Sequence, residues 1–545
     1  MVVPELRPWR AAGPRVARAA SAVRPRLARA ARSAGPRLTR LARAAAPQLA
    51  RGPKTWQYTA GAATAGLALA AGVVTAVGPW DSTGQRTAER DRAVARAHTG
   101  GADHGRGTAG PGAASGTPRP APSAASVLTA LAGTSGAVPG GVRAAPRGEA
   151  LADALGPLLA DPALGTRNGA AVVDLTTGER LYGRGAGTPL TPASTTKIAT
   201  AVAALDALGP DHRLTTRTAL EAGTGELVLV GGGDPTLTAR ADDGGTSRSS
   251  EAESGGGLAS LRTLAEKTAA ALKKRGVREV TLSYDTTLYA GTETHPIGVN
   301  ENLAPVTALM ADEARTDDSG SGPAPRAADP AADAARAFAG FLGEHGVTAS
   351  SPGPSKATAR AATLATVSSP PLSALVERML TNSDNDIAEA LARHTALATG
   401  HPADFDGVSA ALTARLKRLG LPVRGAVFHD GSGLDRTDRI TADLLTALLA
   451  EAADPARPEL RPVLTGLPVA GFTGTLSGRY ADGAAGLVRA KTGTLTGVNT
   501  LAGTVATPDG HLLAFAFLAH DTTDPQAAQT ALDEAATALA SPAPA

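Results

Sequence analysis

The sequence contains no cysteine. This absence excludes disulfide bonds, thiol catalysis, thiolate metal ligands and attachment to a membrane through a lipid-modified cysteine. Aromatic residues are also scarce, at 3% of the chain, although hydrophobic residues make up 43% and are sufficient for a sizeable core. The H-E-x-x-H spacing of metal hydrolases does not occur, so the sequence predicts no metal site and no cofactor.

Charge is distributed unevenly along the 545 residues, a length typical of two or three domains. Residues 1–54 carry twelve arginines and one lysine against the single acidic residue Glu5, whereas the rest of the chain is net acidic. Related P-R-x-x-R units begin at Pro14, Pro25 and Pro36. The pattern predicts a basic cytoplasmic tail that either contacts anionic lipid or nucleic acid or is disordered. Of these partners, we do not expect nucleic acid.

Residues 55–80 contain no charged side chain. They are long enough to cross a bilayer, and Trp56, Tyr58 and Trp80 stand near the ends, where interfacial aromatic residues occur. The arginines on the N-terminal side predict that the tail stays inside and that the rest of the chain is exported. The segment is therefore either a single-pass signal anchor in the cell membrane or a long signal peptide whose removal would release the protein.

Residues 81–146 are rich in Gly, Ala, Pro, Ser and Thr, without an apolar period, which predicts a flexible linker. Folded structure is expected over 147–541. An amphipathic helix is predicted at Glu149–Gly165, followed by a β-hairpin in GAAVVDLTTGERLYGR. Near the C-terminus, GLVRAKTGTL, NTLAGTVATPDG and HLLAFAFLAHD read as three successive strands. Helices between these strands indicate an α/β (α+β) fold whose sheet joins both ends of the folded region.

The stretch PASTTKIATAV places Ser194 and Lys197 three residues apart at the start of a helical pattern. Residues i and i+3 share one face of a helix, so the hydroxyl and the amine can meet. A serine nucleophile needs a neighbouring base. Lysine can serve if its pKa falls from about 10.4 toward neutrality, a change of roughly 4 kcal/mol. Burial and a second nearby cation both lower a lysine pKa.

Two later motifs supply such groups. TNSDNDIAEAL contains Ser383 and Asn385 at the start of another helical pattern, and RAKTGTLTG contains Lys491 in a predicted strand. Each motif alone is weakly specific. In the order S-x-x-K, S-D-N and K-T-G, with these structural contexts, they form the motif set of penicillin-binding proteins and class A β-lactamases.

Five stretches extend the similarity: GGGDPTLT at Gly231–Thr238, SDNDIAEAL at Ser383–Leu391, DGSGLDR at Asp430–Arg436, LPVAGFTGTL at Leu467–Leu476 and RAKTGTLTGV at Arg489–Val498. With them the chain resembles the D-alanyl-D-alanine carboxypeptidase/endopeptidase family, the low-molecular-mass class C penicillin-binding proteins. The resemblance covers about 147–541. It implies a serine β-lactamase/transpeptidase-like domain with an accessory region inserted at about 213–365. The accessory stretch HPIGVNENLAPVTALMADEARTDD departs from the family pattern.

The resemblance also implies catalytic roles. Ser194 would be the acylated nucleophile and Lys197 its general base. Ser383 would relay a proton toward the leaving amine, and Lys491 would supply positive potential.

Substrate binding is implied for a second group. Asn385 would hold the amide side chain of the substrate, and Thr492 and Thr494 would bind its terminal carboxylate. Gly493 would let the substrate backbone approach the edge strand closely. The backbone N–H groups of Ser194 and Thr494 would form the oxyanion hole.

The implied activity is a D-alanyl-D-alanine carboxypeptidase or endopeptidase that acts on peptidoglycan stem peptides through a serine acyl-enzyme and is inhibited by penicillins and other β-lactams. The alternatives are a serine β-lactamase and a catalytically silent wall-binding module of the same fold. The sequence lacks an E-x-x-L-N stretch to position a deacylating water, and its three motifs are intact. We interpret GGGDPTL and DGSGL as turns and assign no catalytic role to Asp234 or Ser432.

Overall fold

The computed structural model describes residues 148–240, 257–350, 352–480, 483–508 and 510–541. The predicted basic tail (1–54), membrane segment (55–80) and linker (81–146) lie outside these residues. Within the described ranges, no helix combines the length and the apolar character needed to cross a membrane.

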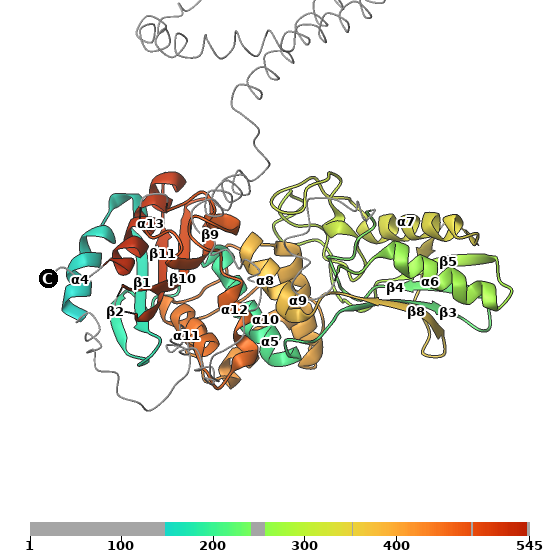
Figure 1. Ribbon diagram of the computed structural model, residues 1–545, viewed down its shortest axis with the longest axis horizontal. Helices are drawn as coiled ribbons and strands as arrows, with labels where there is room; N and C mark the ends of the chain where they lie inside the picture. Colours follow the sequence, from blue (N-terminus) through green and yellow to red (C-terminus); the bar gives the residue numbers. More distant parts are fainter. Residues whose placement is uncertain (1–147, 241–256, 351, 481–482, 509, 542–545) are drawn as a thin grey trace, which may run out of the picture. The chain divides into compact units, whose positions relative to one another are not determined.

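A five-stranded antiparallel sheet with strand order β2-β1-β11-β10-β9 joins the two ends of the described chain (Figure 1). Its strands are β1 (Arg167–Asp174), β2 (Arg180–Arg184), β9 (Val488–Leu495), β10 (Val498–Ala506) and β11 (Leu512–His520). The predicted hairpin and the three predicted C-terminal strands are confirmed by this pairing. Strand β9, which carries the K-T-G motif, forms one edge of the sheet.

Both faces of this sheet are covered, because successive side chains of a strand point to opposite faces. Along β11, Ala514 and Ala516 belong to one buried cluster, and Phe515 and Phe517 belong to the other. Helix α11 packs on the first face and α13 on the second, which explains why β10 and β11 are buried along nearly their whole length. The helices of this part are α4 (Gly148–Leu158), α5 (Thr196–Leu208), α8 (Leu372–Asn382), α9 (Asn385–Ala398), α10 (Phe405–Arg418), α11 (Ala442–Ala453), α12 (Pro462–Thr465) and α13 (Pro525–Ala540).

The first helix is shorter than the sequence pattern predicts. Helix α4 ends at Leu158, and the 3-10 helix η1 (Pro162–Leu164) follows it. The Asp161 carboxylate accepts a hydrogen bond from the backbone N–H of Ala163 at 2.7 Å, which caps η1. Pro162, the first residue of η1, has no N–H to continue an α-helix, so the apolar period runs on while the helix does not.

A second sheet has strand order β6-β5-β4-β3-β8, with β7 paired to β5. Its strands are β3 (Thr215–Leu220), β4 (Glu226–Val230), β5 (Glu279–Asp285), β6 (Thr348–Ala349), β7 (Gly353–Pro354) and β8 (Ala362–Ser368). Helices α6 (Leu261–Lys274) and α7 (Pro330–Glu344) pack against each other and share a buried apolar cluster with this sheet. The accessory region predicted at about 213–365 overlaps these elements. Its status as an insertion in the peptidase domain stays a prediction.

The described part therefore has a mixed α/β fold. The three motifs lie on a 3-10 turn with α5, on the α8–α9 junction, and on β9. Helix α5 packs against α8 and α9, and β9 packs against the 3-10 turn η2 (Ala193–Thr195).

Candidate active site

Ser194 lies in η2, directly before α5. The preceding residue, Ala193, has a positive φ of 49°, a left-handed conformation that is costly for a residue with a Cβ. The turn is held in place because the hydroxyls of Thr195 and Thr500 both donate hydrogen bonds to the Pro192 carbonyl, at 2.7 and 2.8 Å. The Ser194 side chain is half-buried. The turn thus presents its hydroxyl at a fixed place above the first turn of α5.

The Lys197 side chain is completely buried, and its amine makes three hydrogen bonds. Its Nζ lies 3.1 Å from the Ser194 hydroxyl, 2.6 Å from Asn385 Oδ1 and 2.7 Å from the Ser432 carbonyl oxygen. Burial lowers the pKa of Lys197 to about 8, although carboxylates around the site, Asp430 foremost, oppose this change. The helical spacing that the sequence indicates therefore brings the amine to the hydroxyl, and burial shifts its pKa toward that of a base.

The S-D-N motif forms the junction between α8 and α9. Ser383 ends α8 in the left-handed conformation, with φ 59° and ψ 38°. Asp384 caps α9 by accepting a hydrogen bond from the backbone N–H of Ile387 at 3.0 Å. Because Asp384 serves as the cap, the side chains on either side of it, Ser383 and Asn385, are available for other contacts.

Lys491 is the second buried amine. Its Nζ donates to the Ser383 hydroxyl and to the Thr492 carbonyl oxygen, both at 2.8 Å. Burial, together with repulsion from Lys197, lowers the pKa of Lys491 well below its ordinary value. Each motif serine therefore has a lysine amine beside it. Because the two amines repel, protonation of one disfavours protonation of the other.

Strand β9 runs beside the nucleophile turn. A Cβ on Gly493 would lie 2.8 Å from the Pro192 carbonyl oxygen and 3.0 Å from the Ser194 nitrogen, which shows how closely the two backbones approach. Thr492 donates its hydroxyl to Thr475 at 3.0 Å. Thr494, the next alternate residue along the edge strand, has an exposed side chain.

The contacts join the predicted residues in two sets, Ser194–Lys197–Asn385 and Ser383–Lys491, with Gly493 beside the first set and Thr492 beside Lys491. Thr494 is placed by strand pairing with Asn499. The structure thus brings these residues close together, while their roles in catalysis, in substrate binding and in the oxyanion hole stay predictions.

Sequence reasoning missed three contributors. The Ser432 carbonyl, in the turn to which we assigned no catalytic role, accepts from Lys197, and the Asn302 carbonyl accepts from the Asn385 amide at 2.8 Å. Thr475 bonds the K-T-G threonine. The first two act through backbone oxygens, which no side-chain pattern reveals. The third, Thr475, lies in the stretch LPVAGFTGTL. The resemblance of this stretch to the family does not indicate which of its side chains contacts the K-T-G motif.

Among the described residues, two buried groups of acidic and histidine side chains are close enough to hold a metal ion: His295, Glu389 and Asp430, and Glu313, Asp384 and Asp386. Protein groups already complement the charge of both. His295 pairs with Asp430, and Arg315 and Arg378 pair with Glu313. Neither group gives an argument for a metal, and the expectation of a metal-free enzyme stays a prediction.

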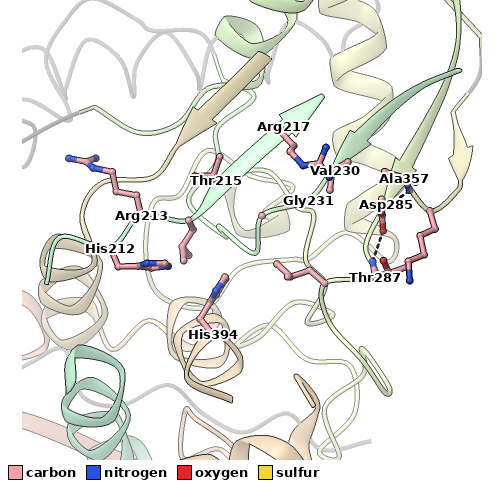
Figure 2. Close-up of a pocket in the computed structure, with 14 residues that line it drawn as sticks. His212, Arg213, Thr215, Arg217, Val230, Gly231, Asp285, Thr287, Ala357 and His394 are labelled. Carbon is pink, nitrogen blue, oxygen red and sulfur yellow. Dashed lines mark hydrogen bonds between the residues drawn. The ribbon is translucent and has the colours of Figure 1, made fainter. Parts of the chain in front are cut away.

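An open pocket of about 600 Å³ lies elsewhere, where α9 meets the strands of the second sheet (Figure 2). Its lining includes Arg217, Gly231, Lys356 and His394, and none of the residues predicted for the active site. Burial lowers the pKa of His394 to about 4, so this imidazole is neutral at physiological pH. This pocket is thus distinct from the cluster of motif side chains.

Comparison with known proteins agrees with the motif geometry. The model of the D-Ala-D-Ala carboxypeptidase 3 (S13) family matches residues 151–319 and 316–539. The carboxypeptidase DacB of Mycolicibacterium smegmatis is 37% identical over 409 residues, which cover 73% of this chain and 85% of that protein. The D-alanyl-D-alanine carboxypeptidase of Actinomadura sp. strain R39 is 32% identical over 459 residues, covering 69% and 82%.

This chain also shares its fold with a solved structure. Penicillin-binding protein 4 (dacB) from Haemophilus influenzae superposes with a TM-score of 0.57 at 21% identity, over 72% of this chain and 98% of that one. The order of the three motifs, their convergence around two buried lysines, and the family match over most of the chain agree with one another. The chain belongs to the D-Ala-D-Ala carboxypeptidase 3 (S13) family.

Proposed function

We propose that this protein is a serine-type D-alanyl-D-alanine carboxypeptidase with endopeptidase activity, acting on the stem peptides of peptidoglycan. The observation that carries the proposal is the 3.1 Å contact between the Lys197 amine and the Ser194 hydroxyl, in which the amine is fully buried. Its pKa of about 8 leaves a useful fraction unprotonated near neutral pH, so it can accept a proton from serine.

Acylation follows from this pair. As the Ser194 oxygen forms a bond to the carbonyl carbon of the penultimate D-alanine, its proton passes to the Lys197 amine. The carbonyl oxygen gains negative charge, which the backbone N–H groups of Ser194 and Thr494 would stabilise. Gly493 permits this arrangement, because a side chain there would intrude between β9 and the nucleophile turn.

Release of the terminal D-alanine requires a proton on its departing nitrogen. The Ser383 hydroxyl, which accepts from Lys491, would relay the proton that Lys197 took from Ser194 to this nitrogen as the carbon–nitrogen bond breaks, which leaves Lys197 unprotonated again. Water then attacks the acyl carbon and gives a proton to Lys197, which would pass it to the Ser194 oxygen as the ester bond to the acyl carbon breaks. A β-lactam would form the same ester with Ser194 without releasing a leaving group.

The charge on Lys491 influences whether Lys197 is protonated. A substrate carboxylate beside Lys491 favours its protonated form, since an opposite charge raises a lysine pKa. The resulting ammonium repels a proton on Lys197, because the two groups already influence each other. Substrate binding would therefore keep Lys197 unprotonated when the base is needed, with Thr492 at the carboxylate site.

Labelled benzylpenicillin tests the proposal directly. The wild-type protein is expected to acquire one covalent adduct, located on Ser194 by mass spectrometry of its peptides. Ser194→Ala should acquire none, because only the attacking oxygen is lost. Equal labelling of both proteins would refute the assignment of the nucleophile.

The same preparations distinguish related activities. A diacyl-D-Ala-D-Ala peptide should yield D-alanine with wild type and not with Ser194→Ala. Rapid steady turnover of nitrocefin would instead indicate a β-lactamase. Acylation without D-alanine release from any D-Ala-D-Ala substrate would indicate a wall-binding module with a residual site.

We also propose that residues 55–80 tether the enzyme to the cell membrane, with the folded region on the outer side. The support is the uncharged run, its flanking arginines and its terminal aromatic residues. In membranes washed with carbonate, the intact chain should stay in the pellet. A soluble, shortened chain beginning after residue 80 would show that the segment is a cleaved signal peptide.

A further inference from the structure

We propose that a short part of the accessory region, residues 295–302, is a positioning element for the catalytic lysine, with His295 as its key side chain. The inference rests on the proposed role of Lys197 as general base. It assigns to the accessory region a part in orienting the catalytic residues. The segment lies between β5 and α7, far in sequence from all three motifs.

The argument starts from the Lys197 amine. Besides Ser194, its partners are the Ser432 carbonyl oxygen and Asn385 Oδ1. These two acceptors fix the direction in which the amine points, because a primary amine swings freely on a four-carbon stem unless its hydrogen bonds hold it. Whatever holds the two acceptors therefore holds the base.

The Asn385 acceptor is held by the accessory segment directly. Its amide nitrogen donates to the Asn302 carbonyl at 2.8 Å, which leaves Oδ1 of the same amide turned toward Lys197. The chain just after the segment is attached to the same helix, since the Ala304 N–H donates to Asp386 Oδ1 at 3.0 Å. The amide orientation of Asn385 is thus set by accessory backbone.

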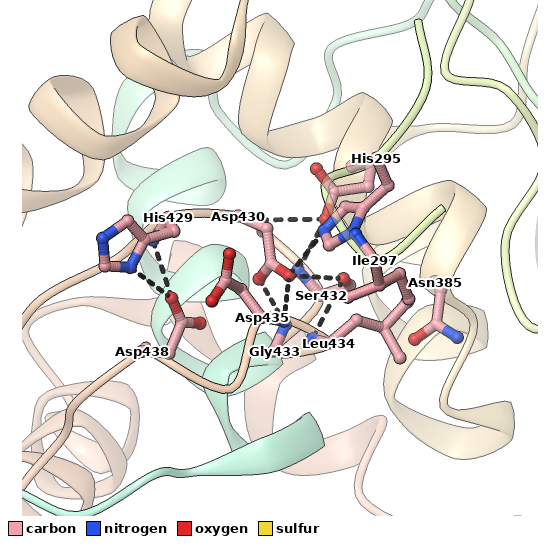
Figure 3. Close-up of polar contacts among 12 residues, drawn as sticks. His295, Ile297, Asn385, His429, Asp430, Ser432, Gly433, Leu434, Asp435 and Asp438 are labelled. Carbon is pink, nitrogen blue, oxygen red and sulfur yellow. Dashed lines mark hydrogen bonds and ion pairs between the residues drawn. The ribbon is translucent and has the colours of Figure 1, made fainter. Parts of the chain in front are cut away.

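The Ser432 acceptor is held through His295 and Asp430 (Figure 3). His295 Nε2 lies 2.9 Å from Asp430 Oδ2, and both side chains are buried. Asp430 in turn accepts from the N–H of Gly433 at 2.6 Å and from that of Asp435 at 2.7 Å. These bonds span the Ser432 peptide and fix the turn that presents its carbonyl oxygen.

The proton on the imidazole can be assigned from its neighbours. The Ile297 N–H donates to His295 Nδ1 at 3.2 Å, so Nδ1 acts as the acceptor and Nε2 carries the hydrogen that is donated to Asp430. The Phe405 ring of α10 packs edge-on against the imidazole, with centroids 5.2 Å apart. The orientation of the imidazole is therefore fixed by a hydrogen bond at each ring nitrogen and by the packing of Phe405.

The charged groups around this imidazole come from two elements besides its own segment. Asp430 and Asp435 lie on the 430–435 turn, and Glu389 lies on α9. Arg393, one helical turn farther along α9, pairs with Glu389.

Glu389 also supports the 430–435 turn, since its carboxylate accepts from the N–H groups of Gly431 and Ser432. A lost His295 contact would leave Asp430 buried without one of its donors and would loosen the turn.

Two replacements of nearly equal polarity test the idea in the full chain. His295→Gln can place an amide N–H near the position of Nε2 and keep the bond to Asp430. His295→Asn is shorter, keeps a polar atom near the position of Nδ1, and cannot reach Asp430. We expect the rate constant of benzylpenicillin acylation to fall about tenfold to a hundredfold in the Asn variant, because small displacements of a catalytic group cost rates of this size. The dissociation constant of the preceding complex should stay within about twofold, and the Gln variant should stay near wild type.

A second readout does not depend on catalysis. With lysines labelled by nitrogen-15 and the Lys197 signal assigned through Lys197→Arg, the Lys197 resonance should move in the Asn variant and return in the Gln variant. His345→Ala, at the end of α7 in the same accessory region, is the matched control and should change neither readout.

The outcomes separate the two proposals. If wild type is not acylated, the proposed function fails while the lysine resonance still decides the positioning role. If wild type is acylated and the Asn and Gln variants behave alike, the positioning role is overturned and the proposed function is untouched.

Discussion

Replacing Lys197 by methionine is expected to slow acylation of Ser194 by benzylpenicillin about 10³- to 10⁴-fold, near the upper limit for loss of a general base. Methionine has a similar length and fits a fully buried site, so packing should survive while the amine beside the hydroxyl is lost. The measurement is the second-order rate constant of adduct formation by mass spectrometry. Circular dichroism should show a fold equal to that of wild type.

The dependence on pH supplies the control for this result. Acylation by wild type should rise with pH through a midpoint near 8, because the Lys197 pKa is about 8 and the unprotonated amine is the active form. The residual rate of the methionine variant should lack this midpoint. Lys197→Arg keeps a positive charge that does not dissociate, so it should be as slow as methionine. A fast arginine variant would show that Lys197 contributes charge and not proton transfer.

Much of the catalytic part of the fold could be predicted from sequence, because its elements carry strong local patterns. The β1–β2 hairpin has a T-T-G turn, and the last three strands are apolar runs separated by turn residues. The end of α4 was harder to predict, since apolar residues continue into η1 after the helix stops. Pairing of β1 with β11, between opposite ends of the chain, has no local signal and follows only from the need to bury both faces of the sheet.

Some contacts of the candidate site could likewise be predicted from sequence, and others could not. Ser194 and Lys197 could be paired from helical spacing alone, while the meeting of Ser383 with Lys491 followed only from the order of the motifs. The Ser432 and Asn302 carbonyls were beyond prediction because every residue has a carbonyl, and the fold alone selects which of them turns toward the site. Sequence motifs report the side chains that react. They do not report the backbone that orients them.

Gly493→Ala is expected to lower the acylation rate about a hundredfold, since displacing a reacting group by an ångström has an effect of this size. The added methyl carbon would lie 2.1 Å from the Thr500 hydroxyl oxygen and 2.8 Å from the Pro192 carbonyl. Thr500 cannot simply turn away, because it is buried and its hydroxyl is bonded to that same carbonyl. Strand β9 must therefore move from the Ser194 turn, which separates the proposed oxyanion donors and draws Lys491 away from Ser383.

The matched control is Gly478→Ala. A Cβ at Gly478 meets no atom within 4 Å, so its rate and stability should stay near those of wild type. Overpacking at Gly493 should also lower the free energy of unfolding by about 1–3 kcal/mol in urea titrations. A Gly493→Ala enzyme that acylates at the wild-type rate would mean that β9 and the nucleophile turn need not touch during the reaction. The close approach of the two backbones would then be a feature of packing alone, and the oxyanion hole would have to be sought away from Thr494.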